Sequence, residues 1–167
     1  VEVDGKTLTG KNLILALGAS PVIPPIPGLK EALDAGIVAT SRELLSLKEL
    51  PKSLVVIGGG VIGVEFASIF GTFGTEVTII EKLDNILVNI DDDARAVLLR
   101  TLARNNIRIE TKAAVTQIAE NNVTYEKDGV PHTVFGEKIL LSVGMRPNSQ
   151  GLENLGLKIE RGAVVTD

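Results

Sequence analysis

The fold is decided by residues 53–81, SLVVIGGGVIGVEFASIFGTFGTEVTIIE. Ser53–Ile57 is a short apolar run of the kind found in parallel strands that are covered on both faces. Three glycines follow it, and after them apolar residues recur at the spacing of an amphipathic helix. These helical positions are Ile62, Phe66, Ile69, Phe70 and Phe73. Thr75–Glu81 has the composition of a second strand, so the stretch predicts a strand, a glycine turn, a helix and a strand.

The glycine turn, Gly58–Gly63, matches the pattern G-x-G-x-x-G. In this pattern the first glycine permits a tight turn, the second lets the backbone approach a diphosphate, and the third allows the helix to lie close to the strand. The N–H groups at the helix start then face the phosphate. Alone the pattern is weak, but here Glu81 ends the second strand 23 positions after Gly58. This is close to the roughly 20 expected for a ribose-binding acid, and the stretch therefore predicts a dinucleotide site.

Glu81 bears on which dinucleotide binds. A carboxylate accepts hydrogen bonds from a ribose 2′-hydroxyl and repels a 2′-phosphate, which favours NAD over NADP. Lys82 is a neighbouring cation that could tolerate a phosphate, although no arginine lies between Glu43 and Ala94 to strengthen that case. FAD also suits a ribose-binding acid and stays open as an alternative.

The composition excludes several kinds of chemistry. The 167 residues have a net charge of −4 with both signs interspersed, which argues against nucleic acid as a partner. The chain has no cysteine, one histidine and one tyrosine, so chemistry is expected to belong to a cofactor. The longest apolar runs are far short of the roughly 20 residues of a membrane span, and the start at Val1 has no targeting signature. We therefore expect a soluble, cytoplasmic protein with no membrane association.

Three acidic or titratable features have a structural alternative. Glu65 lies in the first turns of the predicted helix, where it either gains from the positive helix end or reaches toward the nicotinamide. His132 falls in a predicted hairpin without partners nearby in sequence and is expected on the surface. Asp91–Asp93 suit a helix start better than a cation site, and no metal motif is present.

The remaining elements are predicted from periodicity and turn signals. Val1–Val3 and Asn12–Leu17 are expected to form a hairpin around Asp4, the prolines of Ser20–Gly28 indicate a linker, and Ser41 is expected to cap a helix over Arg42–Leu47. A second amphipathic helix should follow Asp93, with one face formed by Ala94, Val97, Leu98 and Leu102. Further strands are expected at Ile107–Glu110, Val115–Ala119, Asn122–Glu126, His132–Phe135 and Lys138–Val143.

These elements define an α/β fold. The predicted domain is Rossmann-like and three-layered, with a parallel βαβαβ sheet. The short strands from 115 to 135, separated by Asn and Gly turn signals, add an antiparallel β-meander.

Three segments carry a resemblance to a known family. Residues 50–81, LPKSLVVIGGGVIGVEFASIFGTFGTEVTIIE, resemble the nicotinamide-binding domain of the pyridine nucleotide–disulfide oxidoreductases, most of all its dihydrolipoamide dehydrogenase branch. Residues 13–28, LILALGASPVIPPIPG, resemble the segment that enters this domain from the flavin domain, and residues 139–152, ILLSVGMRPNSQGL, the segment that leaves it. The resemblance implies flavin-domain strands and a linker at 1–28, the NAD-binding domain at 29–148, and a return segment at 149–167.

The resemblance also implies the reaction and the site. Family members carry FAD, which exchanges a hydride with NAD(H) and electrons with a redox-active disulfide. This sequence lacks the flavin-binding glycine motif, the cysteine pair and the catalytic histidine of the dimerisation domain, and Leu17 replaces the usual threonine of the flavin side. It is therefore expected to be a fragment that holds no catalytic residue and is inactive alone. The resemblance assigns cofactor binding to Gly58, Gly59, Gly60, Val61, Ile62, Gly63, Val64, Glu65, Glu81, Val115 and Gly144.

Individual roles follow for three of these residues. Glu65 matches the family glutamate beside the nicotinamide, Val115 would lie near the adenine, and Gly144 near the nicotinamide half. Ala113 and Ala114 are alternatives to Val115 in that register.

The full-length protein is expected to be a homodimer, with a place in a 2-oxo acid dehydrogenase complex. Alternatives are the same domain of an NADH oxidase, mercuric reductase or transhydrogenase relative, or a free-standing dinucleotide-binding module.

Overall fold

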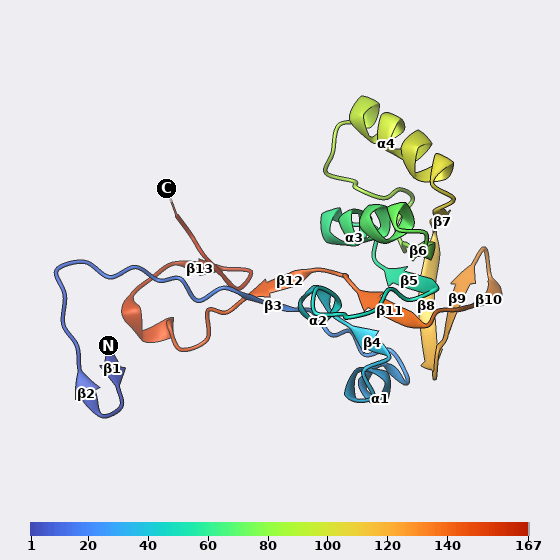
Figure 1. The fold of residues 1–167 in the computed structure, drawn as a ribbon. Coiled ribbons are helices and arrows are strands. Elements are labelled where there is room, and N and C mark those ends of the chain that lie inside the picture. Colours follow the sequence, from blue (N-terminus) through green and yellow to red (C-terminus); the bar gives the residue numbers. More distant parts are fainter. Residues whose placement is uncertain (167) are drawn as a thin grey trace. The chain divides into compact units, whose positions relative to one another are not determined.

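The computed structural model describes residues 1–166, and of Glu153 the backbone alone. The chain divides into two compact units. One unit is Pro21–Gly144, and the other joins Val1–Ser20 to the residues from Met145 onward. Figure 1 labels most of the elements in these units.

The unit Pro21–Gly144 is built on a five-stranded sheet with the strand order β4-β11-β5-β6-β7. All neighbouring strands in it are parallel. The strands are β4 (Val38–Ala39), β5 (Ser53–Ile57), β6 (Glu76–Ile80), β7 (Arg108–Glu110) and β11 (Lys138–Leu141). The helices are α1 (Leu29–Asp34), α2 (Ser41–Leu44), α3 (Val61–Thr72) and α4 (Asp92–Arg104). A separate antiparallel sheet is formed by β8 (Ala113–Ala119), β9 (Asn122–Lys127) and β10 (Val130–Phe135).

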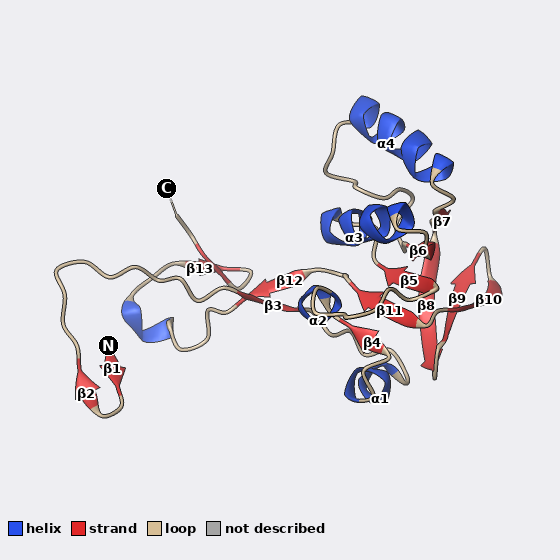
Figure 2. Cartoon of the chain, in the orientation of Figure 1, coloured by secondary structure: helices blue, strands red, loops and turns tan. Residues whose placement is uncertain are grey.

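Two apolar clusters cover the opposite faces of the parallel sheet. Along β5, Leu54 and Val56 belong to the cluster formed with α3 and α4, whereas Val55 and Ile57 belong to the cluster formed with α1 and the antiparallel sheet. This alternation is the period of two that a strand imposes. Figure 2 shows α3 and α4 on one side of the sheet and β8–β10 on the other. The predicted Rossmann-like three-layer α/β fold, with its antiparallel meander, is confirmed.

Local capping explains where two helices begin. The Asp91 carboxylate accepts hydrogen bonds from the N–H groups of Asp93 (3.0 Å) and Ala94 (3.4 Å), so the acidic run starts α4 as the sequence predicts. The predicted cap of α2 is one residue off, because Thr40 and not Ser41 caps it. Thr40 and Glu43 form a capping box, and the hydrogen bond from the Thr40 side chain lowers the pKa of the Glu43 carboxyl.

The buried faces of α3 and α4 differ from the predicted stripes. Ile69 of α3 is 47% exposed and Phe73, the C-cap residue, is 66% exposed, whereas the small residues Gly63 and Ala67 are buried. Small residues face the sheet because they let the helix axis lie close to it, and periodicity of large residues does not reveal this. Of the four residues predicted to form the apolar face of α4, Ala94 and Val97 are exposed, Leu98 is half-buried, and only Leu102 is fully buried.

The other unit contains short strand pairs. β1 (Glu2–Val3) and β2 (Lys6–Thr7) form the predicted hairpin around Asp4, but the second strand is not Asn12–Leu17, which has no regular secondary structure. β3 (Ala19–Pro21), whose first two residues belong to this unit, pairs with β12 (Met145–Pro147). The remaining elements are η1 (Glu153–Leu155), β13 (Ile159–Glu160) and β14 (Ala163–Val164). Across residues 1–166, none of the helices is both long and apolar enough to span a membrane.

Candidate functional site

The glycine turn lies where the order of the parallel strands reverses. β6 and β7 follow β5 on one side of the sheet, whereas β11 lies against the other side of β5. Gly58 directly follows β5, and Ser142 directly follows β11. In open α/β sheets, ligands bind in the crevice at the carboxyl ends of the strands at such a reversal. The turn therefore stands at the position where this fold offers a binding site.

Two glycines of the turn are required by the fold itself. Gly58 has a φ of +106°, and a Cβ built on it would lie 2.5 Å from the Ser142 carbonyl oxygen. A Cβ on Gly63 would lie 2.1 Å from the Gly58 carbonyl oxygen and 3.0 Å from the Val56 side chain. No side chain fits at either position. The first and third glycines thus allow β5, β11 and α3 to approach one another closely.

Gly60 is different, because nothing in the fold requires a glycine there. Its φ and ψ are −74° and −177°, which any residue adopts, and a Cβ would meet no atom within 4 Å. Gly60 is the N-cap of α3, and within residues 1–166 no side chain caps its first N–H groups. Uncapped N–H groups at a helix start bind anions. The bare backbone of Gly60 leaves space for such a group to approach it.

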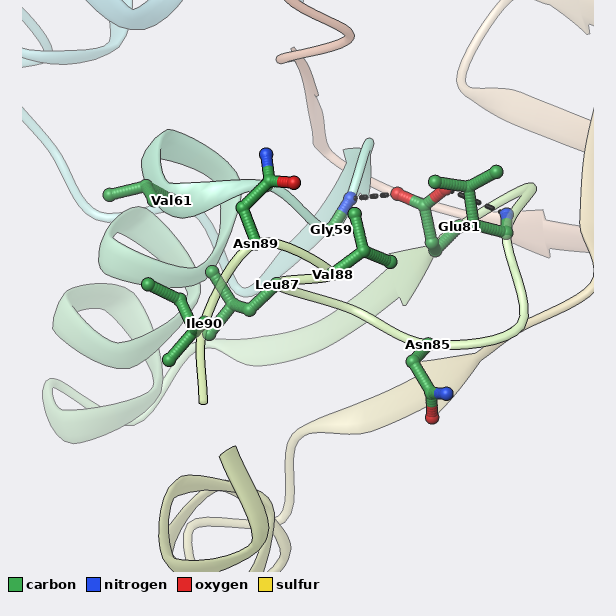
Figure 3. Close-up of a pocket in the computed structure, with 10 residues that line it drawn as sticks. Gly59, Val61, Glu81, Asn85, Leu87, Val88, Asn89 and Ile90 are labelled. Atoms are coloured by element: carbon green, nitrogen blue, oxygen red, sulfur yellow. Dashed lines mark hydrogen bonds between the residues drawn. The ribbon is translucent and has the colours of Figure 1, made fainter. Parts of the chain in front are cut away.

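The Glu81 carboxylate is bound to the same turn. Its Oε2 accepts a hydrogen bond from the Gly59 N–H (2.6 Å), and its Oε1 accepts one from the Leu83 N–H (2.8 Å), as Figure 3 shows. A Cβ on Gly59 would lie 2.4 Å from Ile86 Cγ2 and 3.2 Å from Glu81 Cβ. Glu81 therefore fixes the turn after β5 to the segment after β6, a role that its position in the sequence does not reveal.

A pocket of about 120 Å³ opens between the glycine turn and residues 82–90, which we term the wall segment. The Leu87 N–H donates to the Gly59 carbonyl oxygen (2.9 Å), which holds the wall segment against the turn. Figure 3 shows Asn85 and Asn89 on this segment. The pocket is lined by Gly59, Gly60, Val61, Glu81, Leu83, Asn85, Leu87, Val88, Asn89 and Ile90.

Ser142 is a site residue that sequence reasoning did not find. Its Oγ lies 3.0 Å from the Ile57 carbonyl oxygen and 3.1 Å from the Gly58 carbonyl oxygen, and these two acceptors share its single hydroxyl hydrogen. It thereby satisfies carbonyl groups at the end of β5, where the parallel ladder stops. The signal was a polar residue at the end of an apolar strand, Ile139–Leu141, directly before a glycine-containing exit.

The other predicted binding residues lie outside the pocket lining. Ile62 is half-buried, Val64 is buried, and Glu65 is exposed on α3. Val115 is half-buried beside the irregularity of β8 and packs against the second apolar cluster. Gly144 is exposed with a φ of +124°, and its carbonyl oxygen accepts a hydrogen bond from the Val22 N–H (3.0 Å).

Two polar features have structural roles. His132 is exposed on β10 and stacks on Tyr125 with 5.4 Å between ring centroids. Burial, and next to it the Glu110 carboxylate, raises the pKa of the Tyr125 phenol. Asp91–Asp93 serve the start of α4, and the part of the chain that the structure describes holds no cluster of three or more metal-ligating side chains.

The fold and the glycine turn place the chain among Rossmann-like α/β domains. Its sequence matches the family described as "Pyridine nucleotide-disulphide oxidoreductase" over residues 1–167, and the chain belongs to this family.

Individual relatives agree with this assignment. The chain is 54% identical over 167 residues to a dihydrolipoyl dehydrogenase of Acholeplasma laidlawii, covering 100% of this chain and 50% of that protein. It is 41% identical over 166 residues to a dihydrolipoyl dehydrogenase of Mycoplasma pneumoniae, covering 99% and 36%. Among solved structures, the HOCl-induced flavoprotein disulfide reductase RclA from Escherichia coli aligns with a TM-score of 0.77 and 37% identity, covering 90% and 35%. The chain thus spans half or less of the length of these relatives.

Proposed function

We propose that this chain is the NAD(H)-binding part of an FAD-dependent disulfide oxidoreductase of the dihydrolipoamide dehydrogenase kind. In this proposal, NAD(H) binds at the glycine turn, and the chain holds the nicotinamide for hydride exchange with a flavin bound by other parts of the full-length protein. The observation that carries the proposal is Gly60, a glycine that the packing of the chain does not require and that borders the pocket.

The residues of the site fit a dinucleotide. The N–H groups at the start of α3 would donate to the diphosphate, and the missing side chain of Gly60 would let it approach. The first turn of α3 carries no acidic residue to oppose the negative charge. Asn85 and Asn89 are among the residues that line the opposite wall of the pocket. These groups bind and orient a cofactor, and bound NAD(H) would supply the hydride chemistry.

Glu81 supports NAD(H) over NADP(H). It lines the pocket and is held by the Gly59 and Leu83 N–H groups, each of which uses one carboxylate oxygen. A carboxylate oxygen has more than one lone pair, so both oxygens can still accept from ribose hydroxyls. A 2′-phosphate at the same place would face a negative charge fixed by two hydrogen bonds.

The remaining assignments concern the ends of the cofactor. Glu65, one turn into α3 and exposed, is available to reach toward the nicotinamide. We assign Gly144 to the nicotinamide half and Val115 to the neighbourhood of the adenine. Ile62 and Val64 would support the first turn of the helix from its packed side.

The proposal also covers the segments that flank the NAD-binding domain, residues 1–28 and 149–167. We assign them to a flavin domain and its linker. Residues 1–20 expose several large apolar side chains, among them Leu13 (61%), Ile14 (87%) and Leu17 (48%), which suits a segment covered by further protein. The chain alone would not be catalytically competent, since it has no cysteine for the disulfide step. We expect the full-length protein to be a cytoplasmic homodimer with a place in a 2-oxo acid dehydrogenase complex.

Titration of the purified chain with NADH, NADPH and FAD, side by side, tests this proposal. We expect weak NADH binding, weaker NADPH binding, and no oxidation of NADH by the chain alone. Tighter binding of NADPH would overturn the cofactor assignment. Displacement of NADH by FAD in competition would instead assign the glycine turn to the flavin.

A further inference from the structure

The wall segment, residues 82–90, is held in place by a chain of hydrogen bonds that starts on α4. The Leu87 N–H donates to the Gly59 carbonyl oxygen (2.9 Å), and the Leu87 carbonyl oxygen accepts from the Ile90 N–H (2.9 Å). The Arg95 guanidinium donates through one nitrogen to the carbonyl oxygens of both Ile90 (3.1 Å) and Leu87 (3.4 Å). Its other terminal nitrogen forms an ion pair with Asp92. Arg95 thus connects α4 to the residue that contacts the glycine turn.

The Leu87 backbone needs such support. Its φ is +52°, in the left-handed region that a leucine rarely adopts because its Cβ approaches the carbonyl oxygen. This conformation directs the Leu87 N–H to Gly59 while the neighbouring Ile86 side chain is buried against the turn. A strained backbone persists only where surrounding contacts fix it. Arg95 supplies such contacts, because it donates to the carbonyl oxygen of Leu87 itself and to that of Ile90, three residues after the bend.

Arg95 is built into the fold rather than free on the surface. Its side chain is only 14% exposed, although that of its partner Asp92 is 88% exposed. A guanidinium presents several donors in a fixed planar arrangement, so one group can bind two carbonyl oxygens and a carboxylate together. The ammonium of a lysine cannot reproduce this arrangement.

We propose that Arg95 is a positioning residue for the dinucleotide pocket: it stabilises the left-handed bend at Leu87 and so holds the wall segment, with Asn85 and Asn89, against the glycine turn. This inference rests on the proposed function for its cofactor, NADH. Arg95 is itself absent from the pocket lining, so it acts through Leu87 and Ile90 rather than by contact with the ligand.

The test compares Arg95→Met, which keeps the apolar stem but removes every donor, with Arg100→Met on the same helix. Arg100 is exposed, which makes it the matched control. Two quantities are measured on the purified chain: hydrogen exchange of peptides spanning residues 83–92, and the Kd for NADH. Arg95→Met should speed exchange in these peptides and weaken NADH binding about tenfold, since hydrogen bonds to charged groups are the strong ones. Added guanidinium at low concentration should restore both, and equimolar NaCl should not.

Thermal unfolding is recorded for each variant. If Arg95→Met does not fold, Arg95→Lys takes its place, and the same direction of change is expected because one ammonium cannot replace the guanidinium contacts. Unchanged hydrogen exchange would overturn the inference. Faster exchange with an unchanged Kd for NADH would also overturn it, since the bend would then not serve the pocket. If the unmodified chain itself fails to bind NADH, the proposed function fails, and hydrogen exchange still decides whether Arg95 holds the bend.

Discussion

Replacing Gly60 by alanine separates binding from folding at the glycine turn. The φ of −74° and ψ of −177° suit alanine, and the new Cβ would meet no protein atom within 4 Å. Removing a glycine also lowers the conformational entropy of the unfolded chain. We therefore expect the free energy of unfolding of Gly60→Ala to be unchanged or higher by about 0.5 kcal/mol. The same methyl group would occupy the space that a diphosphate needs beside the α3 N–H groups, so NADH binding should weaken at least about tenfold, or about 1.4 kcal/mol.

Two measurements check this expectation. Urea unfolding without ligand gives the stability of each form, and the fluorescence of NADH during titration gives its Kd. The chain contains no tryptophan and one tyrosine, so protein emission interferes little with the NADH signal. An equal Kd for Gly60→Ala and the unmodified chain would refute the reasoning, because the diphosphate would then not lie against Gly60. A lower free energy of unfolding for Gly60→Ala would refute the claim that no protein atom packs against the position of its Cβ.

Three further changes test neighbouring features. Gly63→Ala should lower the free energy of unfolding by about 1–3 kcal/mol or more, because its Cβ would lie 2.1 Å from the Gly58 carbonyl oxygen; urea unfolding measures this, and an unaffected midpoint would contradict it. Glu81→Gln should lower the free energy of unfolding by about 1–3 kcal/mol, since an amide offers only one acceptor oxygen to the Gly59 and Leu83 N–H groups. It should also reduce the ratio of the Kd for NADPH to the Kd for NADH. Titration of the variant with both nucleotides measures this ratio, and an unchanged ratio would contradict the prediction. Tyr125, the single tyrosine, should titrate above its ordinary pKa of 10.0 in an alkaline absorbance scan. Because folding favours the neutral phenol, Tyr125 contributes to the free energy of unfolding below pH 10.0, and this contribution is lost as the pH rises through the folded-state pKa. In Tyr125→Phe, which has no phenol to ionise, this part of the alkaline loss of stability should be absent.

The centre of the fold could be predicted from local sequence. Ser53–Ile57 is a strand with the predicted bounds, and the strand after the helix spans Glu76–Ile80. Both strands lie inside the sheet, where burial on two faces makes nearly every residue apolar and leaves a clear signal. The glycine pattern is equally local, because its turn and its helix start occupy adjacent residues.

What could not be predicted depends on partners that are distant in the chain. Asn12–Leu17 has strand-like composition but no strand structure, and its apolar side chains are exposed. The two hydrogen bonds that the Glu81 carboxylate accepts, from the Gly59 and Leu83 N–H groups, can be predicted only when the positions of these groups in space are known. Ser142 acts on Gly58, which is 84 residues away, so no local pattern identifies it. The left-handed conformation at position 87 is adopted by a leucine, whereas the residues that usually indicate this conformation in a sequence are glycine and asparagine.

The place of β11 in the sheet has a consequence for the order of folding. Lys138–Leu141 lies between β4 and β5, which are far earlier in the chain, so the last strand of the parallel sheet to be synthesised enters its interior. Contacts of such long sequence separation form slowly, because the intervening loop must first lose its conformational freedom. Until β11 is in place, the Ser142 hydroxyl cannot reach the carbonyl oxygens of Ile57 and Gly58, so the turn after β5 lacks this support. During synthesis, the glycine turn would therefore gain its support from Ser142 late, when the final parallel strand joins the sheet.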